Sequence, residues 1–213
     1  MLQISRRSKL YKDNLKRGIG FLLSLVGIIG LSPVFLILCI LIKLDSKGPI
    51  IFKQKRIGKN KSYFYIYKFR TMKVDTPQEI PTHLLLNPDI YITRVGRFLR
   101  KTSLDELPQL FNILKGEMAI IGPRPALWNQ YDLIEEREKY QANNIRPGLT
   151  GLAQISGRDE LEIHQKAKLD GYYTANMTLW VDLKCFFGTI ISVFKRHGVI
   201  EGGTGYRKKE EVE

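Results

Sequence analysis

The chain has 213 residues, enough for one domain with its own hydrophobic core, and it carries a formal net charge of +13 with a pI near 9.7. This basic excess indicates an acidic partner, such as nucleic acid, anionic lipid or a phosphorylated substrate. The two cysteines, Cys39 and Cys185, lie far apart without ligand spacing, which argues against a disulfide framework and against a zinc site.

The first long segment, Gly18 to Ile42, contains no charged residue. As a helix it would be about 37 Å long, enough to cross a hydrocarbon core of about 30 Å. Ser32-Pro33 near its middle predicts a kink or break, because Pro33 has no N–H and clashes with the carbonyl of Ile29. The Ser32 hydroxyl can bond the backbone groups that the break releases, which makes a bend tolerable in lipid.

Basic residues flank this segment on both sides. Those before it, against the single acid Asp13, are Arg6, Arg7, Lys9, Lys12, Lys16 and Arg17. Those after it, against Asp45, are Lys43, Lys47, Lys53, Lys55, Arg56, Lys59 and Lys61. The positive-inside rule places both clusters on the cytoplasmic side, and a helix that turns at Ser32-Pro33 and leaves by the face it entered would satisfy this rule. A kinked ordinary crossing is the alternative.

Two strands are predicted next, Ile50 to Arg56 and Tyr63 to Arg70, around a GKNK turn. With a period of two, Lys68 and Arg70 share one face of the second strand. Two cations aimed one way suit a phosphate, although a solvated face is the ordinary alternative. The proline-containing segment from Val74 to Pro88 is predicted to be a loop.

A short basic helix or turn, 94–100, leads to a helix predicted from about Ser103 to Lys115 and ended by Gly116. Pro108 fits this helix if it begins at Leu107 or if its first turn is distorted. Ser103-Leu-Asp-Glu106 matches the capping box S-x-x-E, in which Glu106 would only close the helix start.

The adjacent carboxylates Asp105 and Glu106 stand among basic residues, and this pairing suits chemistry on phosphates. One carboxylate can attack phosphorus or bind a divalent metal while arginines hold the oxygens. Their basic neighbours in the sequence are Arg94, Arg97, Arg100, Lys101, Lys115 and Arg124. The capping and the chemical interpretations are compatible, since a helix N-terminus attracts anions.

The remaining segments add candidate binding groups. Prolines on both sides of Arg124 favour an extended backbone, so this guanidinium is either positioned for phosphate or part of a rigid connector. The glycine-rich segment 145–158, ending in Arg158, is a plausible anion- or nucleotide-binding loop. A helix is predicted from Asp159 to near Gly171. The amphipathic segment from Leu179 to Phe194 suits either the headgroup layer or a core.

In their order, these motifs resemble the small bacterial monotopic phosphoglycosyl transferases, the initiating sugar transferases of glycan assembly. The shared motifs are Ser32-Pro33, YKFRTM (67–72), TSLDELPQLFN (102–112), IGPRP (121–125), IRPGLTGLAQISGR (145–158) and the DGYY…DLK segment (170–184). Each motif alone is weak, whereas the ordered set covers nearly the whole chain and is specific. Without a long N-terminal extension carrying further spans, the chain is similar to the minimal form of the family.

The resemblance implies transfer of a phospho-sugar from a UDP-sugar to polyprenol (undecaprenyl) phosphate with release of UMP, in exopolysaccharide or glycoprotein glycan biosynthesis. It implies that Asp105 is the nucleophile, that Glu106 assists as a base, and that Mg²⁺ binds at these two carboxylates. The residues implied around the phosphates and substrate are Lys68, Arg70, Arg100, Arg124 and Arg158. The donor sugar is expected to be an N-acetylated or deoxyamino sugar, with UDP-hexoses as alternatives.

The fold implied is mainly α with a small β-hairpin element (α+β): a re-entrant membrane helix bent at Ser32-Pro33, then a compact cytoplasmic domain with interfacial amphipathic helices. The expected division is 1–44 for the basic N-terminus and re-entrant helix, 45–200 for the catalytic domain and 201–213 for a charged tail. The expected location is the cytoplasmic face of the bacterial inner membrane, in contact with lipid and not with nucleic acid. A membrane-tethered basic module that binds anionic lipid or nucleic acid without catalysis is the alternative.

Overall fold

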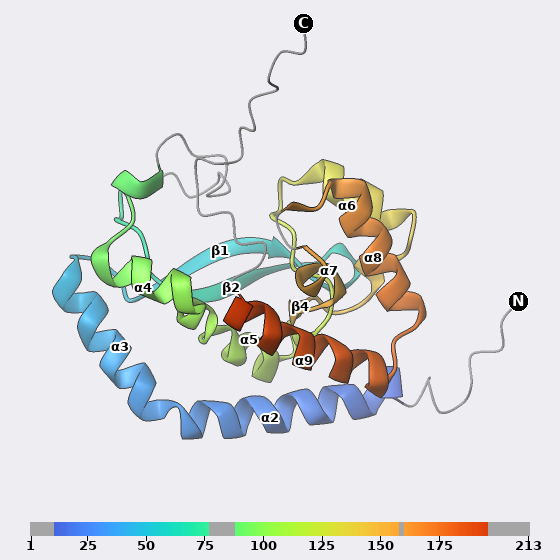
Figure 1. Ribbon diagram of the computed structural model, residues 1–213, viewed down its shortest axis with the longest axis horizontal. Helices are drawn as coiled ribbons and strands as arrows, with labels where there is room; N and C mark the ends of the chain where they lie inside the picture. The colour runs from blue at the N-terminus through green and yellow to red at the C-terminus, as the bar shows by residue number, and fades with distance from the viewer. Residues whose placement is uncertain (1–10, 77–87, 158–159, 196–213) are drawn as a thin grey trace, which may run out of the picture.

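The computed structural model describes residues 11–76, 88–157 and 160–195. A short π-helical turn, Tyr11–Leu15, leads into α2 (Lys16–Gly30) and α3 (Ser32–Asp45), which meet at a bend of 63°. Together these two helices form a bent arm along one side of the molecule, and the other described elements lie within its bend (Figure 1). The expected tail, 201–213, lies outside the described residues.

The bend lies at Ser32-Pro33, as the sequence predicts. Pro33 has no N–H to give to the carbonyl of Ile29, four residues earlier in the chain. The Ser32 hydroxyl donates to this carbonyl instead, at 2.7 Å. The proline therefore breaks the helix, and the serine satisfies the acceptor that the break would leave without a partner.

One side of the arm packs on the body and the other side is apolar and exposed. On α3, Leu38 and Ile42 are buried in a cluster with Phe69 and Leu99. The exposed side includes Leu22, Leu23, Val26, Ile29, Leu36, Ile37 and Leu44. Within the described residues, no single helix has the length and hydropathy of a membrane span, whereas the bent pair α2 and α3 reaches both together.

The predicted hairpin is present. Strands β1 (Ile51–Ile57) and β2 (Tyr63–Phe69) pair antiparallel, with Ile51 opposite Phe69 and Ile57 opposite Tyr63, around a 3₁₀ turn at Lys59–Lys61. Phe64 and Ile66 of β2 are buried against Ile113 and Met118, which seats the hairpin on the helix that follows the carboxylates.

A second, parallel two-stranded sheet was not predicted. It joins β3 (Ala119–Ile121) to β4 (Gly148–Thr150), with Ala119 opposite Gly148. Here the backbones approach closely: a Cβ at Gly148 would lie 2.1 Å from the backbone N of Gly122, and one at Gly151 would lie 2.1 Å from the carbonyl oxygen of Gly122. The glycines that suggested an anion-binding loop thus have a packing role.

The remaining helices are α4 (Arg94–Thr102), α5 (Gln109–Lys115), α6 (Tyr131–Glu138), α7 (Leu152–Ile155), α8 (Ile163–Ala175) and α9 (Leu179–Lys195), with 3₁₀ turns at Pro88–Ile90, Leu104–Glu106 and Ala142–Asn144. The predicted end of α8 near Gly171 is wrong. The helix continues to Ala175, and Gly171 lies within it where the helix packs closely on Tyr140: a Cβ at Gly171 would lie 2.3 Å from the Cβ of Tyr140.

Two polar contacts hold these helices together. Arg137 of α6 donates to the buried carboxylate of Asp170 on α8 through Nε at 2.9 Å and Nη2 at 2.6 Å. Asp182 of α9 accepts from Tyr11, from Tyr173 and from Lys16 at the start of α2. The second contact ties the beginning of the arm to α9, whose apolar side chains Trp180, Phe186, Phe187 and Ile191 are exposed.

Candidate active site

The two carboxylates lie on a 3₁₀ turn between two helices. Helix α4 ends at Ser103, which has a left-handed backbone (φ 58°) and makes no side-chain capping bond. Asp105 and Glu106 follow in the turn Leu104–Glu106, and α5 begins only after Pro108. The predicted capping box is therefore wrong, as is a continuous helix from Ser103, whereas Gly116 ends α5 in a left-handed conformation as predicted.

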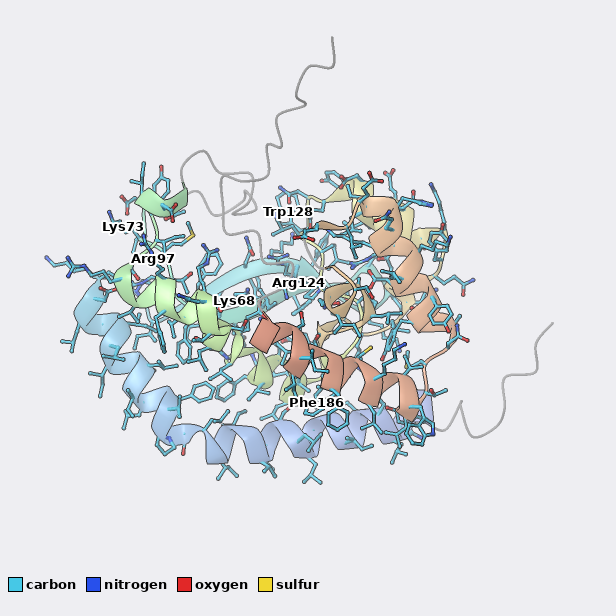
Figure 2. All side chains as sticks on the ribbon, in the orientation of Figure 1. Lys68, Lys73, Arg97, Arg124, Trp128 and Phe186 are labelled. Carbon is cyan, nitrogen blue, oxygen red and sulfur yellow. The ribbon has the colours of Figure 1, made fainter. Side chains whose placement is uncertain are left out.

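Cations from two distant segments converge on this turn. The Lys68 ammonium, from β2, lies 2.7 Å from Oε1 of Glu106 and 3.6 Å from Oδ2 of Asp105. Nη2 of Arg124, from the segment after β3, lies 2.7 Å from the same Glu106 oxygen. Figure 2 shows both cations near each other in the middle of the view. The structure thus brings together four of the residues selected from the sequence.

The surroundings of the two carboxylates shift their pKa values in opposite directions. Burial favours the neutral form of Glu106, but Arg124 and Lys68 outweigh it and hold the pKa of Glu106 well below its usual range. Burial raises the pKa of Asp105, the charge of Glu106 adds to this effect, and Lys68, Arg100 and Arg124 oppose it. In the described part of the chain, no group donates a hydrogen bond to the Asp105 carboxylate. Asp105 is therefore the carboxylate whose oxygens are available for chemistry.

The other selected arginines have different positions. Arg100, in the last turn of α4, contributes positive charge near Asp105. Arg70 is buried, and its guanidinium donates to the carbonyls of Ser46 and Lys47 at the end of α3, at 2.6 and 2.9 Å. In this structure Arg70 thus anchors the arm to the hairpin. Arg158 lies outside the described residues.

A cavity of about 220 Å³ adjoins the carboxylate turn at Glu106 and Arg124. Its walls are mostly apolar and come from the segment after the turn, from α5, from β3 and β4, and from α7 and α9: Leu107, Leu110, Ile120, Leu149, Ile155, Phe186 and Ile190. One buried polar side chain, Gln154 of α7, also lines it, and neither atom of its amide group has a hydrogen-bond partner among the described residues. Such a group costs free energy unless a ligand pairs with it, so Gln154 joins the candidate site. Nothing in the sequence pattern distinguished this residue.

Comparison with known proteins agrees with this geometry. The model of the bacterial sugar transferase family matches residues 11–196. The chain belongs to the bacterial sugar transferase family. This match confirms the prediction of a phosphoglycosyl transferase at the level of family and enzyme class. It also argues against the alternative of a basic module without catalysis.

Relatives of this transferase include short and long proteins. The exopolysaccharide production protein PSS of Rhizobium leguminosarum is 41% identical over 85% of this chain and 96% of its own length. An uncharacterized sugar transferase of Haemophilus influenzae is 38% identical over 93% of this chain and 45% of its own length. The undecaprenyl-phosphate galactose phosphotransferase of Salmonella typhimurium is 38% identical over 86% of this chain and 41% of its own length. The chain thus spans less than half of the longer relatives.

The donor set of the transferase fits a magnesium ion only in part. Within the described residues, no group of three His, Cys, Asp or Glu side chains is placed to hold a metal. Mg²⁺ often uses one or two carboxylates and completes its coordination with substrate phosphates and water. Asp105 suits this mode, whereas both oxygens of Glu106 already accept from Arg124.

Proposed function

We propose that this transferase moves a phospho-sugar from a UDP-sugar to undecaprenyl phosphate in two steps. An oxygen of Asp105 attacks the β-phosphorus, the bond from this phosphorus to the bridging oxygen breaks, and UMP leaves. A phosphate oxygen of the acceptor then attacks the same phosphorus and releases Asp105, which leaves a polyprenyl diphosphate sugar. The names of relatives that act on undecaprenyl phosphate support the acceptor.

One observation carries the proposal: two adjacent, largely buried carboxylates lie within one group of cations, with Lys68 and Arg124 each 2.7 Å from Glu106 and Lys68 3.6 Å from Asp105. A displacement at phosphorus depends mainly on positioning and on neutralising charge. Lys68, Arg100 and Arg124 supply this charge, while Asp105 supplies a nucleophile to which no described residue donates a hydrogen bond. Mg²⁺, held by Asp105 with the donor phosphates, would further neutralise the diphosphate.

The role of Glu106 follows from its ion pairs. A carboxylate with a strongly lowered pKa is a weak base. Glu106 therefore first positions Lys68 and Arg124. It becomes basic enough to take a proton from the acceptor phosphate once the substrate phosphates have drawn these cations away. The carboxylate thus has a positioning role in the first step and a basic role in the second.

The apolar cavity beside Glu106 suits the lipid acceptor. It extends from the carboxylate turn to Phe186 and Ile190, whose side chains are also exposed on the apolar face of α9. An acceptor with its phosphate at Arg124 would place its first isoprene units along this apolar surface. We therefore also propose that α9 lies in the headgroup layer, with its exposed apolar side chains toward the lipid.

We also propose that the arm enters the cytoplasmic face of the bacterial inner membrane and returns to it. The apolar exposed side of α2 and α3, the bend at Ser32-Pro33 and the basic flanks support this topology. Cysteines introduced at Ser5 and Lys47 test it. Both should react with a membrane-impermeant reagent from the cytoplasmic side, and labelling from opposite sides would indicate a crossing.

The reaction is tested with purified protein, undecaprenyl phosphate and a panel of UDP-sugars, while the released nucleotide is identified. The proposal predicts UMP, and it predicts none from Asp105→Ala. Release of UDP would indicate a glycosyl transfer instead, and UMP release that survives in Asp105→Ala would exclude Asp105 as the nucleophile. The panel also identifies the sugar.

A further inference from the structure

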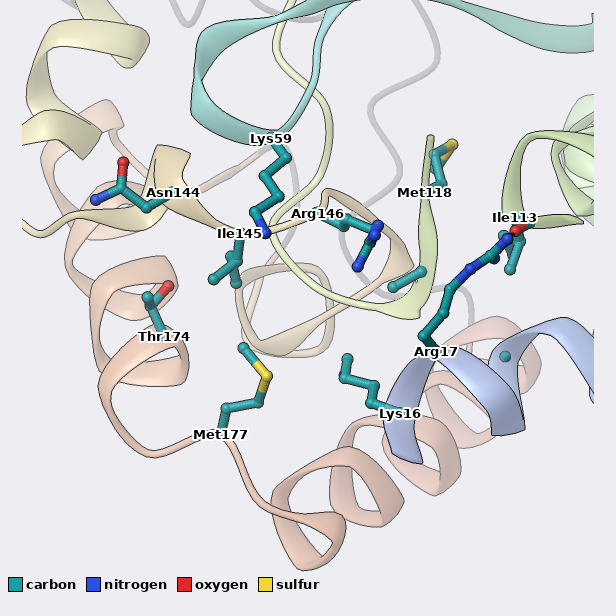
Figure 3. Close-up of a pocket in the computed structure, with 12 residues that line it drawn as sticks. Lys16, Arg17, Lys59, Ile113, Met118, Asn144, Ile145, Arg146, Thr174 and Met177 are labelled. Atoms are coloured by element: carbon teal, nitrogen blue, oxygen red, sulfur yellow. Dashed lines mark hydrogen bonds between the residues drawn. The ribbon is translucent and has the colours of Figure 1, made fainter. Parts of the chain in front are cut away.

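A second cavity, of about 270 Å³, lies between the arm and the body, away from the carboxylate turn. Its walls come from the start of α2, the hairpin turn, the segment joining α5 to β3, the loop before β4 and the end of α8 (Figure 3). It shares no lining residue with the cavity beside Glu106. The chemistry proposed above does not use it.

Four of its lining residues are basic and none is acidic: Lys16, Arg17, Lys59 and Arg146. Lys16 is paired with Asp182. Across the described ranges, no carboxylate lies within ion-pair distance of the other three. Three positive charges therefore border one cavity without a counter-charge from the described residues.

The two guanidinium groups are held in place by backbone carbonyls. Nη2 of Arg17 donates to Leu114 at 2.7 Å, and Nε of Arg146 donates to Gly116 at 2.9 Å. The Arg17 guanidinium also lies close to Gly116: a Cβ at Gly116 would be 3.1 Å from Nη2 of Arg17. Two like charges are thus fixed around one glycine. Figure 3 shows Lys59 reaching toward the same space from the hairpin turn.

This arrangement suits a phosphate-type anion. Arginines whose orientation is already fixed lose little entropy when they bind phosphate oxygens, and their mutual repulsion is relieved by a negative ligand. Lys59, which is exposed and makes no ion pair with the described residues, can close over the anion from the other side.

The place of the cavity favours lipid as the source of the phosphate. Lys16 and Arg17 begin α2, and the apolar residues Phe21, Leu22 and Leu23 that follow are exposed. If the arm enters the membrane as proposed above, the cavity lies at the level of the headgroups. An anionic leaflet supplies phosphates at this depth. We propose that the cavity binds the headgroup of an anionic phospholipid.

The test uses the full chain in neutral detergent and native mass spectrometry, with a short-chain phosphatidylglycerol, the matching phosphatidylcholine and inorganic phosphate as separate probes. Wild-type protein should bind phosphatidylglycerol, and Lys59→Gln/Arg146→Gln should bind it at least about tenfold more weakly, because each lost charge-assisted bond is a large contribution. Lys59→Glu, which leaves the Arg146 contact intact, should also weaken binding, so the proposal can fail even if the double variant does not fold.

Lys61→Gln is the matched control, since Lys61 lies on the same turn but pairs with Glu138 at 3.4 Å. It should bind like wild type. Equal binding by wild type and Lys59→Glu, or an equal loss in Lys61→Gln, would overturn the proposal, as would binding of inorganic phosphate without the lipid. Asp105→Asn should bind the lipid normally, so failure of the proposed chemistry is distinguishable from failure of this site.

Discussion

Gly148→Ala probes the link between the packing of the short parallel sheet and the active site. The new Cβ would lie 2.1 Å from the backbone N of Gly122 and 2.5 Å from the carbonyl oxygen of Thr150. Because these are backbone atoms, an ordinary contact of 3.4 Å with Gly122 requires its segment to move away from β4 by about 1.3 Å, and relief of the contact with Thr150 requires β4 itself to distort. Overpacking of this kind costs about 1–3 kcal/mol, which lowers the unfolding temperature by roughly 2–12 °C for a chain of this size.

The same separation should reduce catalysis at temperatures where the protein stays folded. Arg124 follows Gly122 by two residues, and its Nη2 lies 2.7 Å from Glu106. A misplacement of about 1 Å can cost about 10²-fold in rate. Turnover is measured as UMP release at low temperature, and unfolding by a thermal scan in detergent.

Gly18→Ala is the matched control for Gly148→Ala. A Cβ at Gly18 meets nothing within 4 Å, and the residue lies in α2, where alanine is a better helix former than glycine. Its stability and turnover should equal or slightly exceed those of wild type. If Gly148→Ala keeps the wild-type unfolding temperature and turnover, the reasoning from close backbone packing is refuted.

Three further predictions follow from the site and the arm. Asp105 must be ionised to attack, and burial raises its pKa, so kcat/KM should fall on the acid side at a higher pH than for an ordinary aspartate. Lys68→Met removes a cation that opposes this pKa shift, so it should move the fall in kcat/KM to still higher pH. An unchanged pH profile in Lys68→Met would contradict this prediction. Gln154→Leu should raise the unfolding temperature, because it removes a buried amide that has no partner among the described residues, and should raise KM for one substrate. If neither KM changes, the role of Gln154 is structural. Arg70→Met should destabilise the fold by about 1–3 kcal/mol, because it removes hydrogen bonds to the carbonyls that follow α3, and should leave the KM for the donor unchanged. A raised KM for the donor would favour the substrate-binding role expected from the sequence.

The features that could be predicted from the sequence depend on local chemistry. The break at Ser32-Pro33 follows from the missing N–H of a proline, and the hairpin follows from aromatic and β-branched residues on both sides of a GKNK turn. The C-terminal boundary of α5 at Gly116 follows from the left-handed conformation that glycine tolerates.

The features that could not be predicted depend on contacts between distant segments. Strands β3 and β4 have three residues each, too few for a visible period, and they are separated by 26 residues of sequence (122–147). Ser103 matches a helix start locally, yet the end of α4 places it in a left-handed conformation, and the cations of Lys68 and Arg124 engage Glu106 instead. The sequence pattern treats Lys68 and Arg70 alike, and only the contacts that each side chain makes with distant segments distinguish their roles.

The central claim, a covalent bond between Asp105 and the donor phosphoryl group, is tested most directly by intact-protein mass spectrometry. The transferase is incubated with its UDP-sugar in the absence of acceptor and quenched in acid. The account predicts an added mass of one phospho-sugar on the peptide that contains Asp105. This adduct should disappear when undecaprenyl phosphate is supplied, and it should not form in Asp105→Asn. A protein that turns over both substrates while no such adduct forms, or an Asp105→Asn variant with wild-type turnover, would contradict it.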